Sequence, residues 1–240
     1  MSTTKKTRTA PACSFNQKLK EALMQAMADY TAHGDDMHVI CTENTKTHLL
    51  AIGLLPLITC HARCRKTCGQ VKPGRYLPDC YAARIANARP LNMRRLAINT
   101  AIYLLDPVKY WREIDGVMKC QRFMRLFDSG DANLPGYFDG LCKVLEANPH
   151  CHLQGFTKCF EIVNTYIDNH GKLPDNLHLL FSGWFDMLPD NPHGLPESRV
   201  YENELPENWL SCGGNCSNCA CIGLGCWKAG RGDIVGLKKH

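Results

Sequence analysis

The fold is decided by residues 122–181, RFMRLFDSGDANLPGYFDGLCKVLEANPHCHLQGFTKCFEIVNTYIDNHGKLPDNLHLLF. Three short apolar segments in this stretch have the composition of strands, and two longer ones carry apolar residues at helical spacing. In chain order they are a strand at 122–127, a helix at 137–147, a strand at 152–157, a helix at 160–169 and a strand at 177–181. Strands that alternate with helices form a parallel sheet with right-handed crossovers. The expected fold class is therefore α/β, as an open parallel sheet or a partial (β/α) barrel, because three strands are too few for a complete eight-stranded barrel.

The carboxyl ends of these strands form the candidate ligand site, because parallel sheets bind ligands at that edge. The segments that leave the strands begin at residues 128, 157 and 182. We expect Asp131 and Lys158 to be catalytic, since an acid and a lysine can transfer protons when burial shifts their pKa values. An alternative role for Asp128 and Asp131 is structural, in an ion pair or as a helix N-cap. The residues expected to hold a cofactor or substrate are Ser129, Gly130, Thr157 and Ser182.

The flanking segments complete one α/β domain over residues 13–240. A helix is expected from Ser14, which forms a capping box with Gln17, up to Gly34. Residues 49–58 predict a buried strand or an irregular apolar segment, and residues 91–105 predict a helix. Asp106 and Pro107 then have the order of an N-cap and first helical residue. Residues 187–209 contain four prolines and predict a loop.

Fifteen cysteines in 240 residues are far more than a chain of this size needs to fold. Because the sequence has no secretory signal, we expect a reducing compartment in which disulfides rarely persist. Nine cysteines fall into two groups, and thiolates at such close spacing predict metal binding. The first group is Cys60, Cys64, Cys68 and Cys80, and the second is Cys212, Cys216, Cys219, Cys221 and Cys226. The six other cysteines, at positions 13, 41, 120, 142, 151 and 159, are expected to be small buried apolar residues.

The spacing within the groups favours an iron–sulfur cluster, most simply [4Fe–4S], with zinc as the alternative. Structural zinc favours C-x2-C pairs, and only Cys216 and Cys219 form one. Residues 212–219 have the C-x3-C-x2-C spacing that resembles the cluster-binding triad of radical S-adenosylmethionine enzymes, although that triad precedes the barrel and only 21 residues follow Cys219. Residues 60–80 lie where a cluster loop should lie relative to the βα units, with C-x3-C-x3-C spacing. Either both groups hold one centre together, or each binds its own ion.

The charge distribution gives little support for a nucleic-acid partner. The net charge is 28 − 23 = +5, and the first ten residues with Lys238 and Lys239 account for all of it. We expect residues 1–12 to be a disordered basic tail. The longest apolar run, residues 49–58, is too short to cross a membrane. No Walker A loop, dinucleotide fingerprint, HExxH or GxSxG occurs, so nucleotide hydrolysis, nicotinamide chemistry and serine or zinc hydrolysis have no support.

The order of several short motifs resembles the gene product 88 family of phage-encoded, cysteine-rich proteins. These motifs are TCHARCRKTC at 59–68, CYAAR at 80–84, SGD at 129–131, GFTK at 155–158, FSGW at 181–184 and CSNCACIGLGCW at 216–227. The resemblance implies a phage or prophage origin and the cytoplasm of the host cell, but no particular reaction. The chain departs from the family pattern in a Gly/Pro loop between Cys68 and Cys80.

Together these patterns predict a cytoplasmic protein in which the two cysteine groups meet at the strand ends around an iron–sulfur cluster. The first functional hypothesis is a redox or radical-type enzyme, in which the cluster transfers an electron to a small molecule held over Asp131 and Lys158. Its partner would be that small molecule or a redox protein. The alternative is a non-catalytic, zinc-stapled module that binds a host protein or nucleic acid.

Overall fold

A computed structural model describes residues 15–43, 47–72, 77–184 and 187–238. The predicted basic tail, residues 1–12, and the predicted cap Ser14 lie outside these residues. Within the described part of the chain, no helix has the length and apolarity required to span a membrane.

An eight-stranded open sheet runs through the molecule in the order β1-β2-β3-β4-β5-β6-β8-β7. Only β1 is antiparallel to its neighbour, and the other pairs are parallel. From β2 to β6 each strand lies beside the one that precedes it in sequence, so every crossover steps the same way. The strands are β1 (Thr42–Glu43), β2 (Leu50–Ile52), β3 (Phe123–Leu126), β4 (His152–Thr157), β5 (Leu177–Ser182), β6 (Glu197–Tyr201), β7 (Leu210–Ser211) and β8 (Ile234–Lys238).

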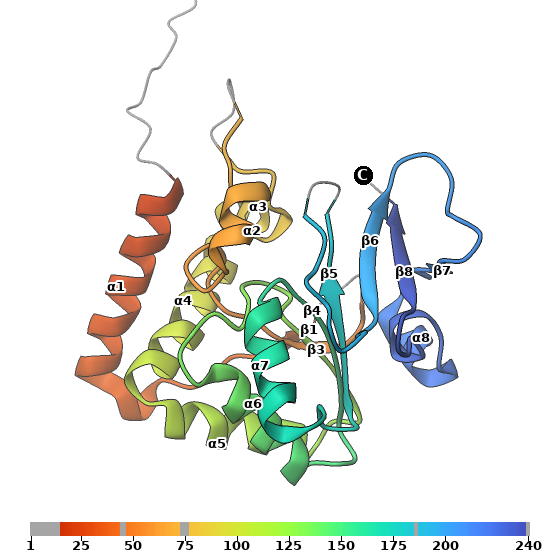
Figure 1. Cartoon of the computed structure of the whole chain (residues 1–240). Helices are drawn as coiled ribbons and strands as arrows, with labels where there is room; N and C mark the ends of the chain where they lie inside the picture. Colours follow the sequence, from red (N-terminus) through yellow and green to blue (C-terminus); the bar gives the residue numbers. More distant parts are fainter. Residues whose placement is uncertain (1–14, 44–46, 73–76, 185–186, 239–240) are drawn as a thin grey trace, which may run out of the picture.

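Most helices lie on one side of the sheet, and a short C-terminal helix lies on the other side (Figure 1). Long helices precede β3 and connect β3 to β4 and β4 to β5, as the crossovers of a parallel sheet require. The helices are α1 (Phe15–His33), η1 (Gly34–Asp36), α2 (Ala62–Thr67), α3 (Tyr81–Ala88), α4 (Pro90–Leu105), α5 (Pro107–Met118), α6 (Tyr137–Ala147), α7 (Phe160–His170), α8 (Cys216–Ile222) and η2 (Gly225–Trp227).

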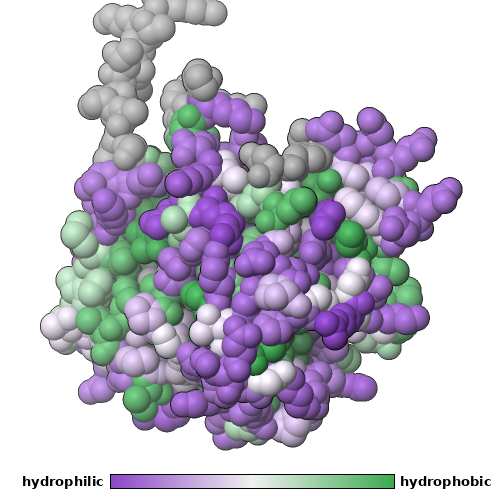
Figure 2. Space-filling view, viewed as in Figure 1, coloured by the Kyte–Doolittle hydropathy of each residue, from purple (hydrophilic) through white to green (hydrophobic). Residues whose placement is uncertain are grey.

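Successive side chains along each strand point to opposite faces of the sheet. Met124 and Leu126 of β3 belong to the main core, which packs against α5, α6 and α7. Phe123 points to the other face and packs against Trp227 of η2, with ring centroids 5.3 Å apart. The hydrophobic cluster around Trp227 has three buried members among the described residues, Leu49, Ala220 and Trp227. The exterior over α6 and α7 is largely hydrophilic (Figure 2).

The predicted central β-α-β-α-β unit is confirmed as β3-α6-β4-α7-β5, with each end within one residue of its predicted position. The predicted helix boundary at Asp106 is also confirmed, because its carboxylate accepts a hydrogen bond from the Lys109 backbone N–H over 2.8 Å and Pro107 is the first residue of α5.

The prediction that residues 187–209 form only a loop is wrong, because they include β6. Its prolines lie outside the strand, where they leave the ladder intact: the carbonyl of Pro196, just before β6, accepts a hydrogen bond from Phe181 N–H. β6 and β8 extend the sheet well beyond the three strands predicted from residues 122–181.

Candidate metal centre

The first four cysteines, Cys60, Cys64, Cys68 and Cys80, lie together where the chain leaves the carboxyl end of β2, and we call them the N-terminal cysteine group. Cys64 and Cys68 are four residues apart around α2, so they share one helix face, and their Sγ atoms lie 3.1 Å apart. Cys64 also interacts with the thiol of Cys60, and Cys68 interacts with that of Cys80, the N-cap residue of α3. The four sulfurs therefore form one continuous series of contacts.

These contacts shift the pKa values of the thiols in opposite directions. The contacts with Cys64 and Cys80 lower the pKa of Cys68, and the Lys158 ammonium acts in the same direction. The contacts with Cys60 and Cys68 raise the pKa of Cys64. The hydrogen bond to Cys68, followed by burial, raises the pKa of Cys80. The group thus places four sulfur donors side by side, and cysteine binds metals in its thiolate form.

The loop after β3 is tied to the N-terminal cysteine group through Thr59. The Thr59 hydroxyl accepts a hydrogen bond from Asp131 N–H over 3.3 Å. The backbone carbonyl of Thr59 accepts one from Asn133 N–H over 3.2 Å. Gly130 makes this approach possible, because its φ of +78° lies in the left-handed region and a Cβ there would come within 2.5 Å of Thr59 Oγ1. The cysteines and the predicted site at the sheet edge are therefore neighbours.

Asp131 is almost fully enclosed, with 4 % of its surface exposed. Its Oδ1 accepts hydrogen bonds from Thr157 Oγ1 over 2.6 Å and from Ala132 N–H over 2.8 Å, and its Oδ2 accepts one from Lys158 N–H over 2.7 Å. Burial raises the pKa of Asp131, while these three donors favour its charged form. Both carboxylate oxygens are occupied, so the geometry favours a positioning role for this residue.

Lys158 and Ser182 lie together at the ends of β4 and β5, as predicted. Lys158 Nζ donates a hydrogen bond to Ser182 Oγ over 2.8 Å, and its charge acts on Cys64 and Cys68. The structure therefore brings together four of the six predicted rim residues around Asp131: Asp131 itself, Thr157, Lys158 and Ser182. Ser129 is buried, and its hydroxyl is one of the buried groups without a partner among the described residues.

Asp128, the other acid of this loop, forms an ion pair, which is the structural role predicted as the alternative to a functional one. Its Oδ2 accepts a hydrogen bond from Arg95 Nη2 of α4 over 2.8 Å, and both side chains are largely buried. Two further polar atoms of the pair, Arg95 Nη1 and Asp128 Oδ1, have no partner within the described structure. This ion pair fixes α4 against the start of the loop that carries Asp131.

The second group lies elsewhere, and we call Cys212, Cys216, Cys219 and Cys226 the C-terminal cysteine group. Burial, followed by repulsion from the other three thiols, raises the pKa of Cys226 to about 12, although the Arg125 guanidinium acts in the opposite direction. Burial likewise raises the pKa of Cys216, with Cys212 and Cys219 acting in the same direction. The four thiols are therefore mutual neighbours, on α8, on η2 and just before α8.

The prediction that the two groups meet is wrong. None of the contacts described for either group includes a cysteine of the other, and α2 and α8 lie on either side of β5 in Figure 1. The reason is the direction of the parallel strands. The N-terminal cysteine group follows the carboxyl end of β2, whereas α8 and η2 pack beside Phe123 and His178, near the amino ends of β3 and β5.

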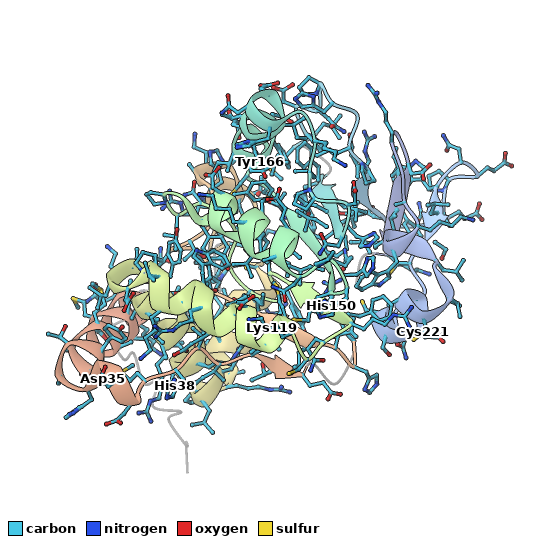
Figure 3. The ribbon with its side chains drawn as sticks, turned by 90° about the horizontal axis from the view of Figure 1, so that it is seen from below. Asp35, His38, Lys119, His150, Tyr166 and Cys221 are labelled. Carbon is cyan, nitrogen blue, oxygen red and sulfur yellow. The ribbon has the colours of Figure 1, made fainter. Side chains whose placement is uncertain are left out.

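Two other cysteines differ from their predicted settings. Cys221 is exposed on α8, because it follows Cys219 by two residues and a helix turns about 200° over that distance. It is labelled in Figure 3 and does not take part in the contacts of the C-terminal cysteine group. Cys120 is exposed rather than buried. Cys142, Cys151 and Cys159 are buried as predicted, Cys41 is partly buried, and Cys13 lies outside the described residues.

Sequence reasoning did not identify Arg125 as part of the C-terminal cysteine group. Its guanidinium donates a hydrogen bond to Cys216 Sγ over 3.5 Å and another to the side chain of Gln154. The signal that could have identified Arg125 is its position as a charged residue in the middle of a strand, between Met124 and Leu126, which are both buried.

The side chains as they stand do not form a closed coordination sphere. Among the described residues, no three His, Cys, Asp or Glu side chains are arranged to hold a metal ion. The donor sets nevertheless suit soft metals, because each group gathers four thiols and thiolates select zinc or iron–sulfur clusters. Binding would require the thiols to rotate about χ1 toward a common centre.

The comparisons with known proteins give one match. The family model described as Gene product 88 matches residues 4–209. The matched segment contains the whole N-terminal cysteine group and the rim residues, and it ends before Cys212. Neither the curated proteins nor the solved structures contain a match.

Proposed function

The chain belongs to the gene product 88 family, and we propose that its family-matched part is an iron–sulfur protein. The N-terminal cysteine group would hold a [4Fe–4S] cluster at the carboxyl edge of the sheet, beside a small molecule bound over Lys158 and Ser182. The protein would serve a redox or radical-type reaction. The observation that carries this proposal is the continuous contact of four cysteine sulfurs next to Lys158.

The location favours a functional centre over a structural one. Ligands of parallel sheets bind at the carboxyl edge, and the first parallel strand, β2, leads directly to Cys60. Two of the four cysteines are buried, so a cluster there would be shielded from water. Thr59 and Asn133 connect the cysteine loop to the Asp131 loop, so a cluster and a ligand would be held in one rigid unit.

The rim residues have separate tasks in this proposal. A bound [4Fe–4S] cluster supplies one-electron transfer. Lys158 carries a positive charge that acts on Cys64 and Cys68, and its Nζ can exchange Ser182 Oγ for an anionic group of the small molecule. Asp131 holds the backbone of Lys158 in place through its hydrogen bond to Lys158 N–H. Lys158 is therefore proposed to bind the ligand, and Asp131 to position Lys158.

A second candidate is zinc in the same group, as part of a non-catalytic module that binds a host protein or nucleic acid. The specific observation in its favour is the 3.1 Å between Cys64 Sγ and Cys68 Sγ. Four thiolates around one zinc ion are about 3.8 Å apart, from a Zn–S distance of about 2.3 Å in a tetrahedron. A [4Fe–4S] cluster holds its ligands farther apart, because each sulfur binds a different iron.

Metal analysis of the anaerobically purified full chain tests both candidates. We expect a brown protein with absorption at about 400 nm and with iron and acid-labile sulfide in equal amounts. Cys64→Ser should abolish the colour. Cys142→Ser is the matched control, because Cys142 is a buried free thiol on α6 outside the group, and it should keep iron. A colourless wild-type chain that binds zinc through Cys64 would replace the iron–sulfur proposal with the zinc module.

A further inference from the structure

The C-terminal cysteine group forms a second potential metal site that is separate from the N-terminal one. Four thiols gather there over 15 residues, and Cys216, Cys219 and Cys226 are partly buried. The family match ends at residue 209, so this group lies outside the matched segment. The proposed function above makes no use of it.

The segment that carries this group has little apolar packing to hold it. Between β7 and β8 the chain leaves the sheet for residues 212–233, and the hydrophobic cluster beside it has three buried members among the described residues, Leu49, Ala220 and Trp227. Trp227 packs on Phe123 and on His178, with ring centroids 5.3 Å away in each case. Such a small apolar cluster is of the kind that small proteins supplement with a metal ion.

The local backbone allows four sulfurs to approach one another closely. Cys216 and Cys219 form a C-x2-C pair on α8, the spacing typical of structural zinc. A Cβ at Gly213 would lie 3.2 Å from Cys219 Sγ, so the turn passes close to the sulfur. Gly214 and Gly225 have φ values of +74° and +54°, which reverse the chain on both sides of the helix.

Arg125 supplies the charge that such a site needs. Four thiolates around a divalent zinc ion carry a net charge of 4 × (−1) + 2 = −2. The Arg125 guanidinium, 3.5 Å from Cys216 Sγ, can donate a hydrogen bond to a metal-bound sulfur and offset part of this charge. It also bonds Gln154 on the same sheet face, which fixes its direction.

The setting favours zinc over a redox centre. The group lies near the amino ends of β3 and β5, away from the edge where parallel sheets bind ligands. Its immediate neighbours are the aromatic rings of Phe123 and Trp227. We propose that Cys212, Cys216, Cys219 and Cys226 bind one structural zinc ion that fastens residues 212–227 to the sheet. Binding converts the four thiols to thiolates and releases their protons to solvent.

The test measures zinc and iron separately in the full chain and its variants. Wild type should contain one zinc per chain in addition to any iron. Cys226→Ser should lose that zinc and leave the iron unchanged, whereas Cys221→Ser should lose neither, because Cys221 lies two residues from Cys219 on a different face of α8. Cys64→Ser should keep the zinc. A Cys226→Ser chain with undiminished zinc, or a Cys64→Ser chain that retains iron in place of zinc, would overturn the proposal.

A second variant keeps all four cysteines and so tests the site even if Cys226→Ser fails to fold. Arg125→Gln should weaken zinc binding about tenfold in competition with a chelator, because partners of ligating groups typically change affinity by 10–100-fold. Arg112→Gln, an exposed arginine on α5, is its control. Equal zinc affinity in the two arginine variants would contradict the arrangement. Failure of the iron–sulfur proposal would appear differently, as a wild-type chain without iron whose Cys226→Ser variant still loses one zinc.

Discussion

The hydroxyl of Thr157 donates a hydrogen bond to the buried Asp131 carboxylate over 2.6 Å and so joins the loop after β3 to the end of β4. Asp131 Oδ2 accepts the Lys158 backbone N–H on the other side. In Asp131→Asn one carboxylate oxygen becomes an NH2 group, so at least one of these donors must face another donor. We expect a loss of about 1–3 kcal/mol in the free energy of unfolding, measured by urea denaturation.

The matched control for this change is Asp175→Asn, because Asp175 is exposed and pairs with Lys172 at the surface. It should alter stability by less than about 1 kcal/mol. An Asp131→Asn chain as stable as the Asp175→Asn chain would show that the three hydrogen bonds to Asp131 do not hold the edge together.

The central fold could be predicted because its signals are local. The segments for β3, α6, β4, α7 and β5 each show a clear period of apolar residues, and the structure has them within one residue of the predicted ends. β6 was missed because Glu197–Tyr201 has the polar composition of a strand near the sheet edge and is surrounded by prolines. A strand of that kind is defined by its partners, β5 and β8, which local sequence does not specify.

The candidate site was predictable in its parts but not in its assembly. Strand ends identified Asp131, Thr157, Lys158 and Ser182, and cysteine spacing identified both groups. Spacing alone could not show that the segment between β7 and β8 places the C-terminal cysteine group near the amino ends of β3 and β5, because that placement depends on the order of strands in the whole sheet. The position of Cys221 on the outer face of α8 likewise required the helix to be known.

Gly130 provides a test of how tightly the Asp131 loop is packed. In Gly130→Ala the new Cβ would meet Thr59 Oγ1 at 2.5 Å and Leu54 Cβ at 2.8 Å, in a backbone conformation with φ of +78°. We expect a loss of about 2–4 kcal/mol in unfolding free energy, from backbone strain and overpacking together.

Gly171→Ala separates these two causes. Gly171 also has a positive φ, +83°, but a Cβ there would meet nothing within 4 Å. Only the backbone cost remains, about 1 kcal/mol. Thermal or urea unfolding of both variants measures the difference, and equal losses would mean that the space around Gly130 is not restricted.

Lys158 should tune the electrochemistry of the proposed cluster. Its charge favours the thiolate form of Cys68, and it should likewise favour the more negative, reduced state of a cluster on the same sulfurs. Lys158→Gln should therefore lower the midpoint potential, on the order of tens of millivolts.

Lys158→Arg preserves the charge and should leave the potential close to that of wild type. Anaerobic potentiometric titration, followed by electron paramagnetic resonance, measures both variants. A potential that rises in Lys158→Gln, or that shifts equally in Lys158→Arg, would argue against a direct charge effect of Lys158 on the cluster.

His178 should make the protein less stable in mild acid. Burial lowers the pKa of His178 to about 4, with a further contribution from His152, whose Nδ1 lies 3.0 Å from His178 Nε2. The unfolded chain has a histidine pKa of about 6.5, so below that value unfolding takes up a proton that the folded state rejects. Stability from this residue is therefore present above pH 6.5 and is lost as the pH falls toward 4. Because the side chain is only partly buried, solvent screening limits the effect to about 1–2 kcal/mol.

Urea unfolding at a series of pH values tests this effect. The His178→Gln chain should lose less stability than wild type between pH 6.5 and 4, whereas the chain with the exposed His150→Gln should follow wild type. Parallel pH profiles for all three chains would exclude His178 as the source of the acid sensitivity.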